Sequence, residues 1–324
     1  MSIAEHSYAP PSSDEILDGE ASEEIVLTIA TTALNEAPNV RPFLDAAVTA
    51  LNRLGVAGEV VFIDDGSSDG TSAAVAEYAR EHNMATPIRL IRHRKPRGLA
   101  AAINESAAAA RGTFICLIPA DLESDPAEDV PKLFRAMDDQ TDFVLGERIG
   151  RNDKKQLASN IYNRLNAWMF GIRARDANWI KLIRTDRLDG IQLRNDWHPF
   201  LAAILAKAGC RFKTVDTTWH SRRHGQSKFG LRRFPKSAAA AVSVKFQLMF
   251  GARPLVFFLA AAAGLGVLGL ALLGGAFMVN ASAARFWTCL IGLSAASFAA
   301  SWLSLVTGLA VDVLANRPTH RTDQ

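Results

Sequence analysis

Short runs of aliphatic and β-branched residues alternate with longer stretches of helical periodicity in the first half of the chain. The apolar runs cover residues 25–30, 59–64, 88–91 and 114–118, and the helical stretches cover residues 42–54, 71–82 and 98–110. Runs that are nearly continuously apolar are typical of strands buried on both faces. The alternation therefore predicts an α/β fold, with a mostly parallel sheet that helices cover on both sides.

Two long apolar segments follow, at residues 254–279 and 286–313, and each exceeds the roughly 20 residues needed to cross a bilayer. The joining residues 280–285 allow only a tight turn, so both ends of this hairpin are expected on one side of the membrane. The turn contains a single basic residue, Arg285, whereas basic residues are frequent on both flanks. They are Arg222, Arg223, Lys228, Arg232, Arg233, Lys236, Lys245, Arg253, Arg317 and Arg321. The positive-inside rule predicts an integral inner-membrane protein whose main domain is cytoplasmic.

Two further segments have amphipathic helical periodicity, one over residues 153–170 and one that begins near Pro235. Their apolar stripes consist of Leu157, Ile161, Leu165 and Trp168 in the first, and of Ala238, Val242, Phe246 and Met249 in the second. Each stripe fits a helix on a membrane surface or a helix that faces the protein core. The membrane surface is favoured for the second segment, because it directly precedes an apolar span. For the first segment, the membrane surface and the protein core remain equal alternatives.

The first 24 residues contain seven acidic and no basic residues, and a disordered acidic tail is expected there. Without the tail, the formal net charge of +3 becomes +10, which suits anionic lipids and phosphate ligands. The cysteines, Cys116, Cys210 and Cys289, lie far apart and are expected to be reduced. The predicted division is a tail (1–24), a main domain (25–230), a juxtamembrane helix (231–253), a transmembrane hairpin (254–313) and a cytoplasmic tail (314–324).

Carboxylates and small residues follow two of the predicted buried strands, in segments 60–71 and 114–126. In an α/β sheet such residues lie at the carboxyl edge of the strands, where ligands bind. Clustered acids would repel a bare phosphate, so a nucleotide would bind there through its base, its ribose and a divalent cation on its phosphates. The two segments indicate a metal-assisted site for a nucleotide-sugar.

Six short motifs occur in an order that resembles the family 2 glycosyltransferases of the GT-A fold. They cover residues 32–36, 63–71, 97–104, 120–126, 146–148 and 222–229. The branch that the chain resembles most includes dolichyl-phosphate mannose synthase and bacterial undecaprenyl-phosphate sugar transferases. The resemblance implies a GT-A domain followed by interfacial helices and a two-helix transmembrane hairpin.

The resemblance implies that Asn35, Glu36 and Asp65 bind the base and ribose of the donor, with help from Asp64. Carboxylates and amides accept hydrogen bonds from N–H and O–H groups, which agrees with that role. The alternative is a structural one, in which residues 64–71 form a turn and an N-terminal cap for the following helix.

Asp121 and Glu123 are the expected ligands of a divalent cation, Mg²⁺ or Mn²⁺, since an extended loop places both carboxylates on one side. Members of the family usually have an aspartate where this chain has Pro119, and a glutamine where it has Glu123. We expect a displaced metal site built on Asp121, Glu123 and the diphosphate of the donor. Weakened metal binding or lost activity is the alternative.

For the acceptor, the resemblance implies that Arg148, Lys155 and Ser159 bind a lipid phosphate. Ordinary surface charge is an equal alternative for Lys155. Arg222, Ser227 and Lys228 are expected to close over the diphosphate or the acceptor. Asp121 and Arg148 are the residues expected to contribute directly to catalysis.

The expected reaction is an inverting transfer of a sugar from a UDP- or GDP-sugar to a polyprenyl phosphate. A processive polysaccharide synthase would normally have more membrane spans and a Q-x-x-R-W motif, and neither is visible in the sequence. An inactive, transferase-like membrane subunit that serves as a binding or scaffolding protein is the alternative. No nucleic-acid partner is expected, and the sequence leaves the formation of a homo-oligomer open.

Overall fold

The computed structural model describes residues 16–17, 24–82, 86–149, 167, 169–172, 174–222, 234–250, 254–278 and 284–315. The chain divides into two compact units, Met1–Lys245 and Phe246–Gln324. The division falls inside helix α7 (Phe234–Phe250), where the sequence predicts the juxtamembrane helix.

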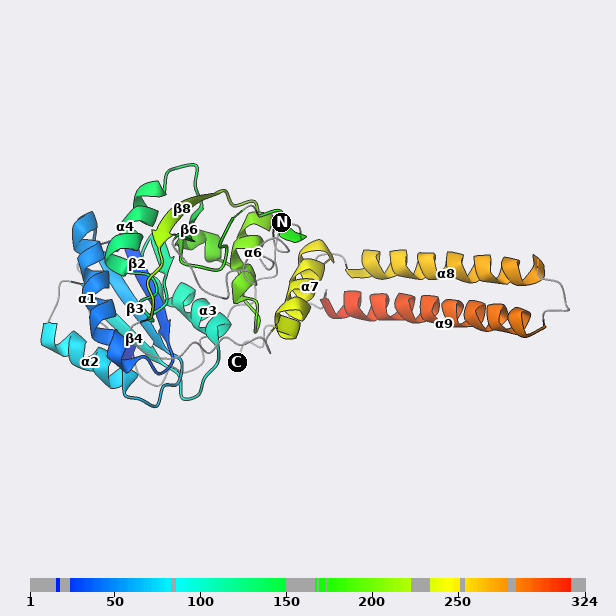
Figure 1. Ribbon diagram of the computed structural model, residues 1–324, viewed down its shortest axis with the longest axis horizontal. Helices are drawn as coiled ribbons and strands as arrows, with labels where there is room; N and C mark the ends of the chain where they lie inside the picture. Colours follow the sequence, from blue (N-terminus) through cyan, green and yellow to red (C-terminus); the bar gives the residue numbers. More distant parts are fainter. Residues whose placement is uncertain are drawn as a thin grey trace, which may run out of the picture. The chain divides into compact units, whose positions relative to one another are not determined.

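The first unit is built around a mixed sheet in which, among the described residues, eight strands lie in the order β1-β4-β3-β2-β5-β7-β6-β8 (Figure 1). The strands are β1 (Ile16–Leu17), β2 (Leu27–Ala33), β3 (Gly58–Asp64), β4 (Ile88–Arg92), β5 (Phe114–Leu117), β6 (Phe143–Ile149), β7 (Lys181–Arg184) and β8 (Phe212–Thr218). Strands β4, β3, β2 and β5 are parallel, as are β6 and β8, whereas β7 is antiparallel to both of its neighbours. The predicted α/β fold with a mostly parallel sheet is confirmed.

Helices cover both faces of this sheet (Figure 1). On one face, α1 (Ala37–Leu54) packs against α2 (Thr71–His82) and α4 (Pro126–Ala136), and on the other face α3 (Leu99–Ala109) contacts β2 and β3. Shorter elements, η1 (Thr185–Leu188), η2 (His198–Phe200) and α6 (Leu201–Lys207), precede β8.

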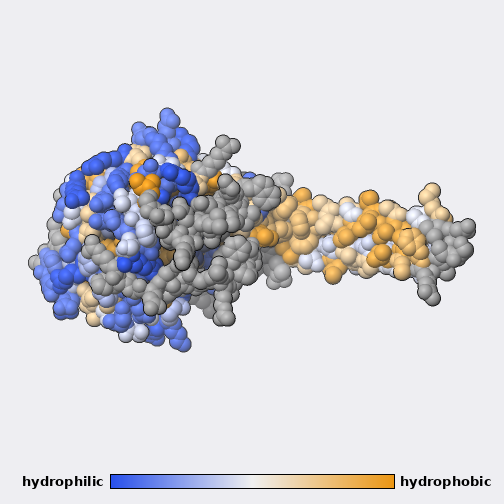
Figure 2. Space-filling view, in the orientation of Figure 1, coloured by the Kyte–Doolittle hydropathy of each residue, from blue (hydrophilic) through white to orange (hydrophobic). Residues whose placement is uncertain are grey.

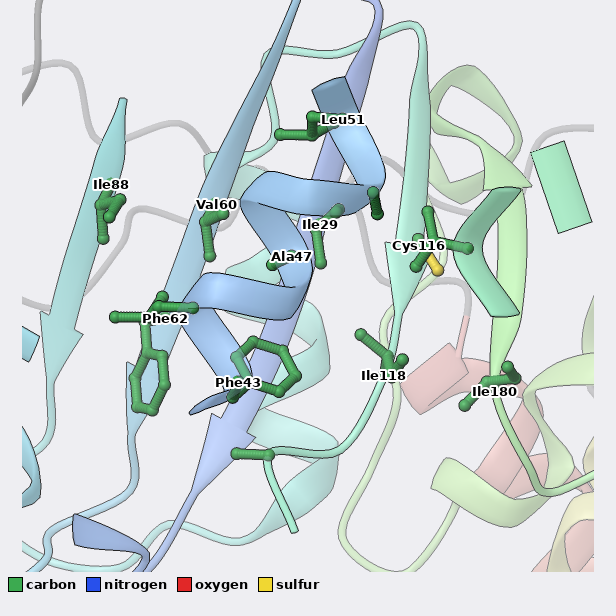
Figure 3. Packing of buried hydrophobic residues seen from close by; sticks show 14 of the residues in the cluster. Ile29, Phe43, Ala47, Leu51, Val60, Phe62, Ile88, Cys116, Ile118 and Ile180 are labelled. Carbon is green, nitrogen blue, oxygen red and sulfur yellow. The ribbon is translucent and has the colours of Figure 1, made fainter. Parts of the chain in front are cut away.

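The core lies between α1 and the central strands (Figure 3). Phe43 of α1 meets Phe62 of β3 edge to face, with ring centroids 6.2 Å apart. Every residue of β3 is buried, as expected for a central strand in a covered parallel sheet. Gly58 is required at the start of β3, because a Cβ atom there would lie 2.4 Å from Leu51 Cδ2 and 2.9 Å from the Leu27 carbonyl oxygen.

The predicted boundaries hold for α2 but not for α1, which begins at residue 37 rather than at 42. The sequence prediction began this helical stretch at Pro42. In the structure the preceding N–H groups have partners from another loop, because Glu36 N–H donates to Thr71 Oγ1 (3.0 Å) and Ala37 N–H donates to Asp69 Oδ2 (3.0 Å). These contacts satisfy N–H groups that the start of a helix leaves without a partner, so the helix can begin five residues before the predicted position.

Two residues of the acidic N-terminal segment, Ile16 and Leu17, form β1 and pair antiparallel with Ile91 and Leu90. Residues 1–15 and 18–23 of the predicted tail lie outside the described residues. So does most of the first amphipathic segment, from residue 153 to residue 166.

The second amphipathic segment is helical, as α7. The most buried side chains of its described part are Ala241 and Val244, three residues apart. Val242 and Met249, which belong to the predicted apolar stripe, are 64% and 57% exposed. The apolar stripe predicted from the sequence is therefore not the buried side of this helix.

The second unit contains two long apolar helices, α8 (Pro254–Met278) and α9 (Ala284–Ala315), which pack along each other. Their candidate spans, Leu255–Met278 and Phe286–Val311, have mean hydropathies of 2.5 and 1.8 and are long enough to cross a membrane. Ser294 Oγ donates to the Gly269 carbonyl (2.8 Å) and Ser301 Oγ to the Ala262 carbonyl (2.7 Å), so their hydroxyl groups are satisfied inside the pair. Apolar residues make up most of the face of this pair that Figure 2 shows.

Candidate active site

Asp64, the last residue of β3, is fully buried, and protein groups bind both of its carboxylate oxygens. Oδ1 accepts the Ser67 N–H (2.8 Å), and Oδ2 accepts the Ser72 hydroxyl. Asp64 therefore shapes the turn between β3 and α2, which is the structural alternative considered for this segment.

Asp65, the next residue, holds a neighbouring loop. Its Oδ1 accepts the Arg97 N–H (2.7 Å) and its Oδ2 the Gly98 N–H (2.9 Å), just before α3 begins. Oδ1 also lies 2.6 Å from His93 Nδ1. Burial acts to raise the pKa of Asp65, but the hydrogen bonds from His93, Arg97 and Gly98 outweigh it and the pKa lies below its ordinary value.

His93 is a buried histidine between two carboxylates. Its Nδ1 faces Asp65 and its Nε2 faces Glu105 of α3, which also pairs with the Arg97 guanidinium. Burial acts to lower the pKa of His93, but the two carboxylates outweigh it and raise that pKa to about 9. Both ring nitrogens therefore donate, as they do only in the imidazolium ion. Sequence analysis missed His93 and Glu105, because a histidine inside a basic loop carries no local signal for such a role.

Asn35 and Glu36 follow β2 and bind the β3–α2 turn. Asn35 has a left-handed backbone (φ 58°), and its Oδ1 accepts the Ser68 N–H (2.9 Å). Glu36 Oε2 accepts a hydrogen bond from Asn39 Nδ2 (2.6 Å). The Asn35 side chain is exposed and Glu36 is half-buried, so both remain at the surface of this edge.

Asp121 and Glu123 lie in the loop after β5 and converge on one cation, the guanidinium of Arg222 (about 100 residues away along the chain). Arg222 Nη2 donates to Asp121 Oδ2 (2.6 Å), and Nε donates to Glu123 Oε1 (2.7 Å). Burial and the adjacent Glu123 charge raise the pKa of Asp121, and Glu36 adds to this effect while Arg222 opposes it. Both carboxylates face one side as predicted, but the loop is not extended as the prediction assumed, because Leu122 between them has a left-handed backbone (φ 56°).

Arg148, near the end of β6, lies beside the same pair. Its Nη1 is 4.0 Å from Glu123 Oε2, its Nε binds the Asp176 carboxylate, and its guanidinium lies 4.2 Å from the centre of the Trp179 ring. Lys181 Nζ donates to the Trp179 carbonyl (2.8 Å), and burial lowers the pKa of Lys181 to about 8. The Trp179 ring, on which the guanidinium stacks, thus helps to hold the Arg148 side chain beside Glu123.

The structure brings together Asp121, Glu123, Arg148 and Arg222 of the predicted site residues. Asn35, Glu36, Asp64 and Asp65 lie at the ends of β2 and β3, but Asp64 and Asp65 are bound by protein groups. The predicted residues Lys155, Ser159, Ser227 and Lys228 lie outside the described residues.

A family model for glycosyl transferase family 2 matches residues 28–198, which is more than half of the chain. The chain belongs to glycosyl transferase family 2. Dodecaprenyl-phosphate galacturonate synthase of Rhizobium johnstonii is 27% identical to this glycosyltransferase over 258 residues, which are 78% of this chain and 75% of the relative. An undecaprenyl-phosphate 4-deoxy-4-formamido-L-arabinose transferase of Aeromonas hydrophila is 27% identical over 213 residues, or 64% of this chain and 63% of the relative.

Two solved structures show that this glycosyltransferase has the GT-A fold. One is glucosyl-3-phosphoglycerate synthase of Mycobacterium tuberculosis in complex with Mn²⁺, UDP-glucose and phosphoglyceric acid, with a TM-score of 0.53 and 16% identity over 68% of this chain and 80% of that one. The other is mannosyl-3-phosphoglycerate synthase of Rubrobacter xylanophilus, with a TM-score of 0.54 and 16% identity over 69% of this chain and 73% of that one.

The carboxylate pair has the chemistry of a site for a hard divalent cation, since Asp121 and Glu123 direct oxygens at a single positive group. Within the described ranges, however, no group of three or more His, Cys, Asp or Glu side chains is placed to hold a metal. A hard cation has more than two ligands, so the pair could supply only part of its coordination shell.

Proposed function

We propose that this glycosyltransferase transfers a sugar, with inversion, from a UDP- or GDP-sugar to a polyprenyl phosphate. The observation that carries the proposal is the pairing of two acids with two arginines at the carboxyl edge of the sheet. Such a cluster suits a reaction between two phosphate-bearing substrates, because acids can hold a cation and arginines can hold phosphate oxygens. The dodecaprenyl and undecaprenyl phosphates in the names of two relatives support a lipid acceptor.

In this proposal, the exposed Asn35 and the half-buried Glu36 contact the nucleoside of the donor. Asp64 and Asp65 do not contact the donor directly in this proposal, because their carboxylates hold the loops that form the edge. This assignment changes the role predicted for Asp65 from reading the nucleotide to positioning residues 93–98.

The proposed reaction is an attack of a lipid-phosphate oxygen on the anomeric carbon, with a nucleoside diphosphate leaving. A phosphate monoester with a second pKa near 6 is largely dianionic at neutral pH, so no strong base is needed. Arg148 orients the acceptor phosphate beside Glu123, and its stacking on Trp179 restricts the guanidinium to that position.

Asp121 and Glu123 would hold Mg²⁺ or Mn²⁺ together with the donor's diphosphate. Such an ion would supply positive charge that stabilises the leaving diphosphate. The Mn²⁺ in the complex of the glucosyl-3-phosphoglycerate synthase supports a divalent cation as cofactor.

The activity test uses the purified full chain, a short polyprenyl phosphate and a panel of UDP- and GDP-sugars, with the lipid product detected by mass spectrometry. The proposal expects one donor to give polyprenyl-phosphate sugar. Nucleotide binding without turnover of any donor would instead support the binding or scaffolding subunit.

The metal ligands are tested by replacing the two unusual residues of the loop. Glu123→Gln should lower turnover roughly a hundredfold or more, since a hard-oxygen ligand is lost. Pro119→Asp in the Glu123→Gln background should recover part of the activity by restoring the arrangement common in the family. If turnover of Glu123→Gln depends on Mg²⁺ or Mn²⁺ concentration as wild type does, Glu123 is not a metal ligand.

We further propose that α8 and α9 span the inner membrane, with the main domain in the cytoplasm and α7 at the membrane surface. The exposed apolar side chains of the pair support this placement, since Phe277 is 80% and Leu303 66% exposed. A cysteine replacing Ala283 should react with a membrane-impermeant reagent added to intact cells. Protection of this position together with labelling of a cysteine at Thr319 would reverse the orientation.

A further inference from the structure

Arg222 bridges the two carboxylates that are proposed to hold a divalent cation. Its Nη2 and Nε lie 2.6 Å and 2.7 Å from oxygens of Asp121 and Glu123. The three side chains are only 12–21% exposed, so water screens the contact weakly. A planar guanidinium with two charge-assisted hydrogen bonds is among the strongest partners that a carboxylate pair finds within a protein.

The backbone next to Arg222 is held in place, whereas its side chain reaches the acids by a flexible stem. The N–H of His220 donates to the carbonyl of Glu123 (2.9 Å), which ties the segment after β8 to the carboxylate loop. Arg222 can therefore change partners by rotating its side chain while the backbone at His220 stays bound. A long arginine side chain reaches several ångströms around its Cα, so a diphosphate held beside the two acids would lie within its range.

We propose that Arg222 occupies the cation-binding position between Asp121 and Glu123 in the donor-free protein, and exchanges these two carboxylates for the diphosphate when the donor binds. This inference rests on the proposed function, since it requires a nucleoside-diphosphate donor. In the donor-free protein, a divalent cation can bind both acids only by displacing Arg222 from the two carboxylates that hold it in the described part of the chain. With a diphosphate present, Arg222 gains a new partner, so the nucleotide and the cation strengthen each other's binding by the same factor.

The test measures Mn²⁺ binding to the full chain in detergent, by electron paramagnetic resonance of free Mn²⁺, with and without UDP or GDP. Arg222→Gln should bind Mn²⁺ about tenfold more tightly than wild type when no nucleotide is present. The factor by which the nucleotide improves Mn²⁺ binding should fall correspondingly. Arg222→Lys keeps the charge but not the planar guanidinium with its two parallel donors, so its Mn²⁺ affinity should lie between those of wild type and Arg222→Gln.

Arg175→Gln is the matched control. Arg175 also binds two carboxylates, Glu147 (2.8 Å) and Asp216 (2.5 Å), but its side chain is 68% exposed and no residue of the candidate site is among these partners. This variant should bind Mn²⁺ as wild type does. Equal or weaker donor-free Mn²⁺ binding by Arg222→Gln relative to wild type would overturn the proposal.

The comparison of donor-free proteins separates this inference from the proposed function. A chain that binds UDP or GDP with Mn²⁺ as expected, yet transfers no sugar to polyprenyl phosphate, refutes the acceptor and retains the role of Arg222. A chain that transfers sugar, but whose donor-free Mn²⁺ affinity is the same with and without Arg222, refutes the exchange and retains the proposed function.

Discussion

Two clusters of carboxylates follow two strands of the same sheet, and their partners differ in kind. Asp64 and Asp65, after β3, bind backbone N–H groups of Ser67, Arg97 and Gly98 and the ring of His93. The second cluster, Asp121 and Glu123 after β5, binds mainly the guanidinium of Arg222. Backbone donors cannot leave without unfolding a loop, whereas an arginine side chain can rotate away. Similar sequence motifs therefore produce two kinds of site. Asp64 and Asp65 form a scaffold cluster that holds neighbouring loops, whereas Asp121 and Glu123 form an exchangeable site, whose partner is a side chain that can move.

The pKa values express the same difference. The hydrogen bonds to Asp65 outweigh the effect of burial and lower its pKa, so the fold stabilises its negative charge. Burial and the adjacent Glu123 raise the pKa of Asp121, so the fold leaves that charge partly uncompensated even with Arg222 present. A carboxylate whose charge the fold compensates only in part has capacity to bind a cation from outside the chain.

The largest expected effect is on stability. Asp65→Ala removes one of the two carboxylates that hold the buried His93 cation and takes the acceptor from the Arg97 and Gly98 N–H groups, and should lower the free energy of unfolding by about 3–5 kcal/mol. Asp121→Ala should lower it by less, because the Arg222 side chain keeps Glu123 and can rotate toward solvent, unlike the backbone N–H groups of Arg97 and Gly98. Denaturant unfolding followed by tryptophan fluorescence measures both. Equal losses in the two variants would remove the distinction between the clusters.

Activity should show the opposite order. Asp121→Asn keeps the shape of the side chain but removes its charge, and should lower sugar transfer roughly a hundredfold, or about 2.7 kcal/mol of transition-state free energy. Its free energy of unfolding should stay near that of wild type, since burial already disfavours the charged form. Asp138→Asn, at a half-exposed carboxylate that pairs with Lys213, is the control and should leave turnover unchanged. Full activity in Asp121→Asn would contradict a catalytic role.

The third prediction concerns pH and the scaffold cluster. Because the pKa of His93 is raised to about 9, the stabilisation from its imidazolium is complete below about pH 6.5 and is lost as pH rises through 9. The loss should be on the order of 3 kcal/mol. Asp65, Glu105 and Arg97 are the charged groups that surround this ring.

The measurement is the free energy of unfolding of wild type and His93→Gln from pH 6 to pH 10. Lys181, whose pKa is lowered to about 8, acts in the opposite direction, because its unfolded form binds more protons above that pH. Lys181 is common to both proteins, so the difference between them isolates His93. A difference that does not shrink as pH rises would show that His93 is neutral.

The smallest expected effect concerns Arg148. Removing one charge-assisted contact to the acceptor, Arg148→Ala should raise the KM for polyprenyl phosphate about tenfold and leave nucleotide affinity nearly unchanged. The control is Arg184→Ala, since Arg184 also lies over an aromatic ring, that of Phe114 (5.1 Å), but belongs to β7 outside the cluster. Equal losses of lipid and nucleotide binding in Arg148→Ala would contradict the assignment of Arg148 to the acceptor phosphate.

Local patterns were sufficient to predict the general architecture. The helix over residues 71–82 and the strand over residues 59–64 agree with α2 and β3 to within one residue, and the two apolar spans correspond to α8 and α9. Periodicity, length and apolar content are properties of neighbouring residues, so a single sequence contains them. The same is true of the motifs, whose order identified the family that the family model then confirmed.

The partners of each charged group depend on the tertiary structure. The sequence by itself placed acids after β3 and β5, but it could not distinguish Asp65, which holds residues 97 and 98, from Asp121, which meets Arg222 about 100 residues later. The early start of α1 likewise depends on Asp69 and Thr71, more than 30 residues away. Hydrogen bonds act over about 3 Å, and only the folded chain brings such distant groups within that range. The fold class thus followed from the sequence alone, whereas the division between scaffold and exchangeable site was decided by the tertiary contacts.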